Sequence, residues 1–187
     1  MEELRDFITN NVNISEMELK EILSNFRQIE LEKGRFLVKR GQLVQSYYFV
    51  ATGGLRIYFD KDEKQITAWI ALDNNFFTEL QSLKSGKSSE FFIQAIERST
   101  VYTIDAQKMH QLYDKFPIWQ RFGRMVWEDA FIKVINGILS HQTLSAEERY
   151  LEILDHSDLL QKIPLKQLAS YLGITETSLS RLRKNIK

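Results

Sequence analysis

The side chains best suited to contact another molecule gather near the carboxyl end of this sequence. From Lys162 onward the segment holds six basic residues and one acidic residue, Glu176, so it carries a net charge of +5 and the rest of the neutral chain carries −5. Hydroxyl and guanidinium groups follow one another between Thr175 and Arg183. Such groups hydrogen-bond to phosphate oxygens and base edges, and clustered cations supply most of the sequence-independent affinity for DNA. The segment therefore favours a DNA-contacting surface, whereas a purely stabilising pair of helices would need no such asymmetry of charge.

Two short helices with a glycine between them are predicted to position these groups. The apolar face of the first helix ends at Leu172, and Gly173 can adopt the left-handed conformation that ends a helix at low cost. Thr175 can cap the second helix, while Leu179 and Leu182 point back to the core. This is the pattern of a helix-turn-helix. It leaves eight candidate DNA-contacting residues: Lys166, Thr175, Glu176, Thr177, Ser180, Arg181, Arg183 and Lys184.

The front of the chain is predicted to be mainly β-structure. A short helix begins at the capping box formed by Ser15 and Glu18, and β-prone runs then alternate with turn residues. Residues 47–51 and 55–59 flank a Thr-Gly-Gly sequence, which is a hairpin signal. Three further β-prone runs follow, at residues 65–72, 91–97 and 100–105. Many short strands at regular spacing indicate a β-sandwich or a jelly-roll-like barrel.

Residues 117–142 are predicted to form one long helix with two apolar faces. One face holds Ile118, Phe122, Met125, Ile132 and Leu139, and the face about half a turn away holds Trp127, Phe131, Val134 and Ile138. Since a surface helix needs one apolar stripe, two stripes indicate cover on both sides. The β domain provides one cover. A twin helix from a second subunit is the simplest second cover, and enclosure within a monomer is the alternative. Without a choice between the faces, the candidate interface residues are Phe122, Met125, Ile132, Leu139, Trp127, Phe131 and Val134.

Several functional classes are disfavoured by what the sequence lacks. It has no cysteine, which excludes disulfides and thiolate metal sites. Its histidines, His110, His141 and His156, form no close pair and no cluster with acids, so no metal site is predicted. A phosphate-binding glycine loop and a nucleophile–base pair are also missing, so we do not expect an enzyme.

The chain is expected to be cytoplasmic and to have no membrane partner. Its first residues, MEELRDFITNN, are acidic and lack the apolar core of a signal peptide. No stretch approaches the roughly 18 apolar residues of a membrane span.

With the tail, the long helix and the β-rich front in place, the chain resembles the Crp/Fnr family of bacterial transcription regulators. The tail and residues 41–59, GQLVQSYYFVATGGLRIYF, carry most of the resemblance. It implies an α+β fold with a jelly-roll-like β-roll of the cyclic-nucleotide-binding type, a long dimerisation helix and a minimal winged helix-turn-helix. The corresponding domains are a β-roll sensor at 1–116, the helix at 117–142 and the DNA-binding domain at 143–187.

The resemblance also assigns roles within the second helix of the tail. Arg181 matches the arginine that family members carry near the middle of the recognition helix, and Glu176 and Thr177 match the other two base-facing positions. Thr177 stands where many members have glutamate, so the resemblance does not fix the base preference at that position. Because the sequence stops just after this helix, we expect the final strands of the wing to be short or missing.

The family's effector pocket aligns with residues 76–95. Thr78, Glu79 and Leu80 match a glycine-glutamate-leucine segment in which the glutamate holds a ribose hydroxyl. Ser89, however, occupies the position of the phosphate-binding arginine, and Glu90 the position of the following hydroxyl residue. A buried phosphate without a cation costs several kcal/mol, so we expect no cyclic AMP and no other cofactor. The candidate effector pocket comprises Thr78, Glu79, Leu80, Ser88, Ser89 and Glu90.

The expected function is sequence-specific DNA binding by a Crp/Fnr-type transcription regulator. A homodimer would bind a pseudo-palindromic operator on double-stranded DNA, and an unidentified small-molecule effector would modulate it. RNA polymerase is a further partner if the regulator is an activator. One alternative is a small-molecule-binding β-roll whose C-terminal helices are only structural, and another is a protein-interaction module that uses the long helix.

Overall fold

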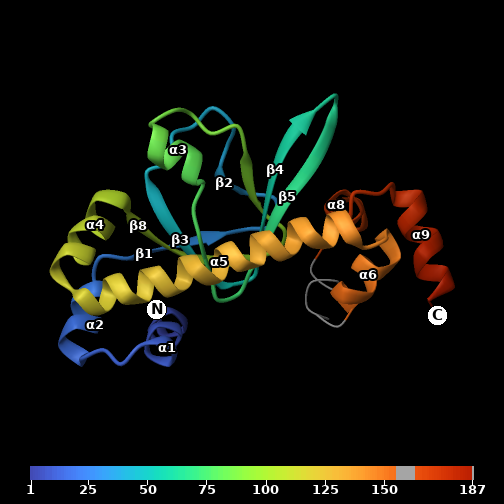
Figure 1. Cartoon of the computed structure of the whole chain (residues 1–187). Helices are drawn as coiled ribbons and strands as arrows, with labels where there is room; N and C mark the ends of the chain where they lie inside the picture. Colours follow the sequence, from blue (N-terminus) through green and yellow to red (C-terminus); the bar gives the residue numbers. More distant parts are fainter. Residues whose placement is uncertain (155–162, 187) are drawn as a thin grey trace.

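The computed structural model describes residues 1–154 and 163–186. Within that part, eight antiparallel strands form two four-stranded sheets with the orders β1-β8-β3-β6 and β2-β7-β4-β5. The strands are β1 (Arg27–Leu31), β2 (Phe36–Val38), β3 (Ser46–Thr52), β4 (Gly54–Lys61), β5 (Lys64–Leu72), β6 (Asn75–Phe77), β7 (Phe92–Ala95) and β8 (Ser99–Asp105). Apolar side chains from both sheets pack together, so the sheets close over a shared core as a β-roll. The predicted α+β class with a jelly-roll-like domain is confirmed (Figure 1).

The turn at Gly53 joins the two sheets instead of closing a hairpin. β3 pairs with β6 and β8, whereas β4 pairs with β5 and β7, so the predicted hairpin between β3 and β4 is wrong. Gly53 has a φ of 94°, and a Cβ there would lie 2.4 Å from Ser99 Oγ. The close approach of β8 therefore requires glycine where the chain crosses between the sheets. A hairpin does lie one strand later, where Asp62 and Glu63, both with positive φ, join β4 to β5.

Helices cover the outer face of the β1-β8-β3-β6 sheet. They are α1 (Glu2–Asn11), α2 (Glu16–Leu23), α4 (Ala106–Lys115) and the first half of α5 (Pro117–Thr143). Trp119 of α5 is fully buried there, stacks on Phe122 with ring centroids 4.7 Å apart, and donates its indole N–H to Met109 Sδ. The predicted capping box of Ser15 and Glu18 is present at the start of α2. The first half of α5 is thus fixed to the roll, and its second half runs on toward the last helices (Figure 1).

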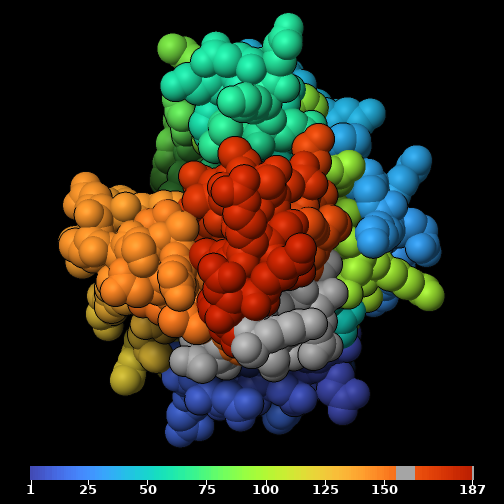
Figure 2. All heavy atoms as spheres, turned by 90° about the vertical axis from the view of Figure 1, so that its right-hand side faces the viewer, coloured from blue at the N-terminus to red at the C-terminus, as the bar shows by residue number. Residues whose placement is uncertain are grey.

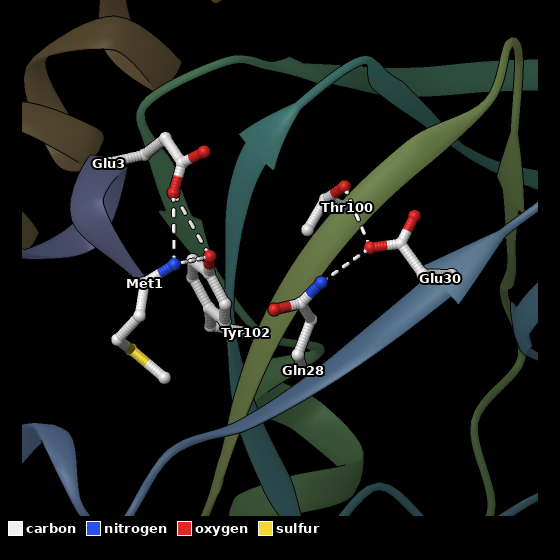
Figure 3. Close-up of polar contacts among 6 residues, drawn as sticks. All are labelled: Met1, Glu3, Gln28, Glu30, Thr100 and Tyr102. Carbon is white, nitrogen blue, oxygen red and sulfur yellow. Dashed lines mark hydrogen bonds and ion pairs between the residues drawn. The ribbon is translucent and has the colours of Figure 1, made fainter.

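Polar contacts tie the N-terminal helix and β1 to β8 (Figure 3). The Glu3 carboxylate accepts a hydrogen bond from the Tyr102 hydroxyl at 3.0 Å, and both groups contact the Met1 nitrogen. A backbone hydrogen bond, followed by the hydrogen bond from the Met1 amino group, lowers the pKa of Glu3. Across the β1–β8 pair, Glu30 accepts a hydrogen bond from the Thr100 hydroxyl at 3.0 Å.

The last described helices form a small domain of their own. They are α6 (Ala146–Leu154), α8 (Leu165–Tyr171) and α9 (Glu176–Asn185), while α3 (Leu80–Ser85) belongs to the roll. Their shared apolar core includes Tyr150, Ile163, Leu168, Ala169, Leu172 and Leu179. Residues 163–186 contain no strand. None of the described helices is long and apolar enough to cross a lipid bilayer.

Candidate nucleic-acid interface and effector pockets

The turn between α8 and α9 is consistent with the predicted helix-turn-helix. Gly173 has a φ of 70°, and the backbone N–H of Ile174 closes the end of α8 on the carbonyl of Ala169 at 3.0 Å. The Thr175 hydroxyl then accepts a hydrogen bond from the backbone N–H of Ser178 at 3.1 Å, which confirms the predicted cap of α9. Leu179 is fully buried against α8. One face of α9 is thereby fixed to the domain core, and its opposite face points to solvent.

Most of the predicted DNA-contacting residues lie on that open face or beside it. Six of the eight are exposed: Lys166, Thr175, Glu176, Thr177, Arg181 and Lys184. Ser180 is partly buried. The exposed Arg181 guanidinium makes no hydrogen bond or ion pair within the described part of the chain. Figure 2 shows α8 and α9, in red, forming the surface at this end of the molecule, beside the β4–β5 hairpin.

Arg183 differs from the other candidates because it contacts the domain core. Its Nε donates a hydrogen bond to the Tyr150 hydroxyl at 3.1 Å, and its guanidinium lies 5.7 Å from the centre of the Tyr150 ring. The side chain is half-buried and links α9 to α6. Arg183 therefore contributes to the packing of the domain, as a cation on an aromatic ring does.

Positive charge remains concentrated on the described residues of this domain. Residues 163–186 hold four basic side chains and one acid, Glu176. Lys162 and Lys187 lie outside the described residues. The surface that presents Arg181 and Lys184 is thus cationic, as contact with phosphates requires.

The helix-turn-helix is docked on the β-roll through α8. The Ser170 hydroxyl donates to the carbonyl of Gln65 at 2.8 Å and accepts from the backbone N–H of Thr67 at 2.9 Å. Both groups belong to β5, which is the last strand of its sheet, so α8 satisfies backbone groups of an edge strand. Ile70 of β5 and Ile96 extend the apolar core of the small domain onto the outer face of the roll. The two domains therefore share one packed interface.

A buried arginine supports this interface from the neighbouring strand. Arg56 of β4 is 3% exposed, and its Nε donates to the Thr67 hydroxyl at 2.9 Å. Its Nη1 donates to Gln65 Oε1 at 3.0 Å, and its guanidinium stacks 4.1 Å above the centre of the Tyr58 ring. Burial lowers the pKa of Arg56. By its hydrogen bonds to Thr67 and Gln65, Arg56 holds in place the segment of β5 that binds Ser170.

The sequence of β5 contains a signal for this interface. In residues 65–72, QITAWIAL, apolar side chains fall on both faces of the strand: Trp69 and Ala71 face the roll interior, while Ile70 faces the small domain. A strand that is apolar on both faces is covered on both faces.

The second half of α5 presents a bare apolar face. Six side chains there are between 39% and 65% exposed: Phe131, Ile132, Val134, Ile135, Ile138 and Leu139. Phe122 lies outside this face because it is buried in the chain's own core, and Met125 and Trp127 are half-buried against the same core. Four of the seven predicted interface residues, Ile132, Leu139, Phe131 and Val134, are therefore free to meet a partner. Such a band on a monomer marks an interaction surface.

The predicted effector residues are divided between two cavities. Glu79, Ser88 and Glu90 line a cavity of about 370 Å³, whereas Thr78 and Leu80 line a larger one of about 880 Å³. Ser89 lines neither cavity. It is 1% exposed, and its hydroxyl accepts a hydrogen bond from the backbone N–H of Phe91 at 3.0 Å.

The smaller cavity has more acidic than basic side chains on its wall. Glu79 caps α3 by accepting hydrogen bonds from the backbone N–H groups of Gln81 and Ser82 at 2.9 and 3.1 Å. Glu90 is exposed and pairs with Arg40 at 3.0 Å. The cavity wall thus has two carboxylates and one ammonium group, that of Lys87, and Arg40 pairs with the carboxylate of Glu90.

Among the described residues, no three histidine or acidic side chains lie together so that they could hold a metal ion. His110 lines the larger cavity, His141 lies near the end of α5, and His156 lies outside the described residues.

Comparison with known proteins shows that this fold is similar to that of cyclic-nucleotide-binding domains and of Crp/Fnr regulators. Residues 28–116 match the family model of the cyclic nucleotide-binding domain. FixK2 from Bradyrhizobium japonicum has a similar structure, with a TM-score of 0.73 and 18% identity over 86% of this chain and 84% of that one. A protein from Eubacterium rectale assigned to the Crp/Fnr family of transcriptional regulators gives a TM-score of 0.70 and 19% identity over 95% and 85%. No curated protein sequence matches the chain significantly.

A further similar structure is the c-di-GMP-responsive global regulator CLP of Xanthomonas campestris. It gives a TM-score of 0.68 and 13% identity over 92% of this chain and 91% of that one. At such low identity these likenesses show a shared fold. The chain therefore has a cyclic-nucleotide-binding-type β-roll within the architecture of Crp/Fnr regulators, and the resemblance predicted from its sequence is confirmed at the level of the fold.

Proposed function

We propose that this protein is a sequence-specific DNA-binding transcription regulator of the Crp/Fnr type. The observation that carries the proposal is α9, which is capped by Thr175, fixed to its domain through Leu179, and open to solvent at Thr177 and Arg181. A helix held in this way can enter a major groove, where hydroxyl and guanidinium groups contact base edges. Lys166 and Lys184 flank it as phosphate contacts, and Arg183 holds α9 on α6.

The regulator acts as a homodimer on a pseudo-palindromic operator. The bare apolar band of α5 supports this assembly, because a twin helix would cover it. Two recognition helices would then enter successive major grooves about 34 Å apart. Regulation of transcription takes place where the DNA is, in the cytoplasm, and RNA polymerase is a partner if the effect is activation.

The effector of this regulator is not a cyclic nucleotide. Ser89 is turned into the protein, Glu79 is occupied as a helix cap, and Glu90 adds a carboxylate to the smaller cavity. The β-roll therefore receives its signal through another small molecule, and no catalytic step is assigned to it.

Selection of bound sequences from a random pool of double-stranded DNA tests the proposal. We expect a selected site with two-fold symmetry and half-sites about one helical turn apart. Arg181→Ala should weaken binding to that site by about 1–3 kcal/mol and relax the preference at one base position. The matched control is Arg27→Ala, which removes an exposed arginine of the β-roll and should leave DNA binding unchanged.

A second candidate is a small-molecule-binding β-roll whose C-terminal helices are structural. The docking of α8 on β5 through Ser170 supports it, because those helices cover an edge strand. A mobility-shift assay at low salt separates the two candidates, since electrostatic attraction is strongest there. No shift under those conditions would favour the second candidate.

A further inference from the structure

The larger cavity lies between the β-roll and α5 and has the size of a small-molecule site. Its volume of about 880 Å³ lies within the range of ligand pockets, roughly 300–1,000 Å³. Its walls come from α1, β3, β4, β5, β6, α3, α4 and α5, elements that are far apart in the sequence. A molecule bound there would touch the sensor domain and the long helix together.

Aromatic rings dominate the cavity wall. Trp69 comes from β5, Tyr113 from α4 and Trp127 from α5, and each of these three is only half-buried. The remaining rings of the wall are Phe7, Tyr47, Phe76, Phe77 and Phe131. Rings pair with other rings in offset or edge-to-face arrangements, and a partly exposed wall gains from being covered. The wall therefore suits a planar aromatic body.

The charges on the wall favour an anion. Lys84 of α3 and Lys133 of α5 line the cavity, and within the described part of the chain neither ammonium group has an ion pair or hydrogen bond. Asp129 is the one acidic residue on the wall, and His110 adds a donor. The smaller cavity has the opposite balance, with Glu79 and Glu90 on its wall.

The bare band of α5 and the cavity wall share Phe131 and Val134, but the other residues of each lie mostly on different sides of the helix. Val126 and Ala130 form part of the cavity wall, whereas Ile135 and Leu139 belong to the bare band of α5. At 3.6 residues per turn these two pairs lie about half a turn apart on the helix. A twin helix on the bare band would thus leave most of the cavity wall uncovered.

We propose that the cavity binds an aromatic monocarboxylate, with its rings against Trp69 and Trp127 and its carboxylate at Lys84 and Lys133. The inference rests on the proposed function, in which this cavity receives the regulator's signal. Trp69 also gives the ligand a route to the DNA-binding domain, because the next residue of β5, Ile70, packs in the core of that domain. A shift of β5 on ligand binding would move both faces of the strand.

Isothermal titration calorimetry with 2-naphthoate, without DNA, tests the site on the full chain. We expect 2-naphthoate to bind about tenfold more tightly than 2-naphthalenemethanol, which has the same rings and no charge. Cyclic AMP and decanoate, a nucleotide and a flexible carboxylate, should bind more weakly than 2-naphthoate. Equal binding of the naphthoate and the alcohol would overturn the role of the two lysines, and tighter binding of decanoate or cyclic AMP would overturn the ligand class.

Variants locate the site. Lys84→Gln combined with Lys133→Gln should reduce naphthoate affinity about tenfold, whereas Lys87→Gln, at the smaller cavity, should not change it. Ala130→Phe should fill the cavity and abolish binding, with circular dichroism confirming that the variant is folded. Unchanged binding in folded Ala130→Phe would overturn the site.

A mobility-shift assay on the same protein separates this inference from the proposed function. DNA binding without naphthoate binding would overturn only the ligand site. Naphthoate binding without DNA binding would overturn the regulator and leave the ligand site in place.

Discussion

His141 lies where α5 meets the helix-turn-helix. A Cβ added to Gly173 would lie 3.9 Å from the His141 ring, and the nearby Arg149 donates hydrogen bonds to the carbonyls of Leu144 and Leu172 at 2.6 and 2.9 Å. Burial, and then the charge of Arg149, lowers the pKa of His141 below its ordinary value of 6.5. The packed junction therefore favours the neutral imidazole.

Acidification should loosen this junction. Since the pKa of His141 is lower in the folded protein than in the unfolded chain, its contribution to stability is complete above about pH 6.5 and is lost as the pH falls below that value. We expect the melting temperature of the wild type to fall more between pH 7.5 and pH 5.5 than that of His141→Gln. Parallel curves for the two proteins would contradict this role.

Single residues differ in how far the sequence alone predicts them. Gly173, Thr175 and Ser15 act within one turn of the chain, and each has the predicted role of helix end or helix cap. Glu79 and Ser89 were aligned with a ligand site, yet Glu79 caps α3 and Ser89 bonds to the backbone of Phe91. The direction of such a side chain depends on the path of the surrounding loop, which local pattern does not determine.

Helix α5 combines a predictable feature with one that needed the structure. Its length and its excess of apolar residues followed from the sequence, and the observed bounds are Pro117–Thr143. The division along its length did not follow from the sequence. A helical wheel distinguishes two faces of the helix, whereas the structure buries its first half and exposes its second half. Trp119 and Phe122 are buried in the first half, and both predicted faces are bare in the second.

A charge in the bare band should prevent pairing of the subunits. Ile135→Asp places a carboxylate where an apolar partner is expected, so its burial would be unfavourable by several kcal/mol. We expect light scattering to report a dimer for the wild type and a monomer for Ile135→Asp at micromolar concentration. The neighbouring Asn136→Asp adds the same charge at an exposed polar position and should remain dimeric. A monomeric wild type would refute the proposed assembly.

The whole molecule is organised around β5, which has the larger cavity on one side and the domain of α6, α8 and α9 on the other. The sequence indicated the sensor roll, the long helix and the helix-turn-helix, because each has its own periodicity. Apart from the second apolar face of β5, it did not indicate how the last domain rests on the first. That contact depends on Ser170, Thr67 and Arg56, which are distant in sequence and polar, and so leave no hydrophobic period.

Removing the Ser170 hydroxyl should release α8 from β5. Ser170→Ala leaves the backbone groups of Gln65 and Thr67 without their partner, at a cost of about 1–3 kcal/mol where water cannot replace it. We expect faster hydrogen exchange at the amides of β5 and α8, and altered DNA affinity, whereas Ser88→Ala, an exposed serine of the roll, should change neither. Unaltered exchange in Ser170→Ala would show that apolar packing alone holds the domains together.

The uncovered stretch from Phe131 to Leu139 links this protein's behaviour to its own abundance. A monomer exposes this apolar surface to chaperones and proteases. A low concentration of the protein therefore shortens its lifetime and also lowers the fraction of dimer. In the proposed regulator, pairing depends on the square of the subunit concentration, so a modest fall in synthesis would lower the occupancy of the operators disproportionately. The cell could thus silence such a regulator simply by making less of it, with no signal molecule involved.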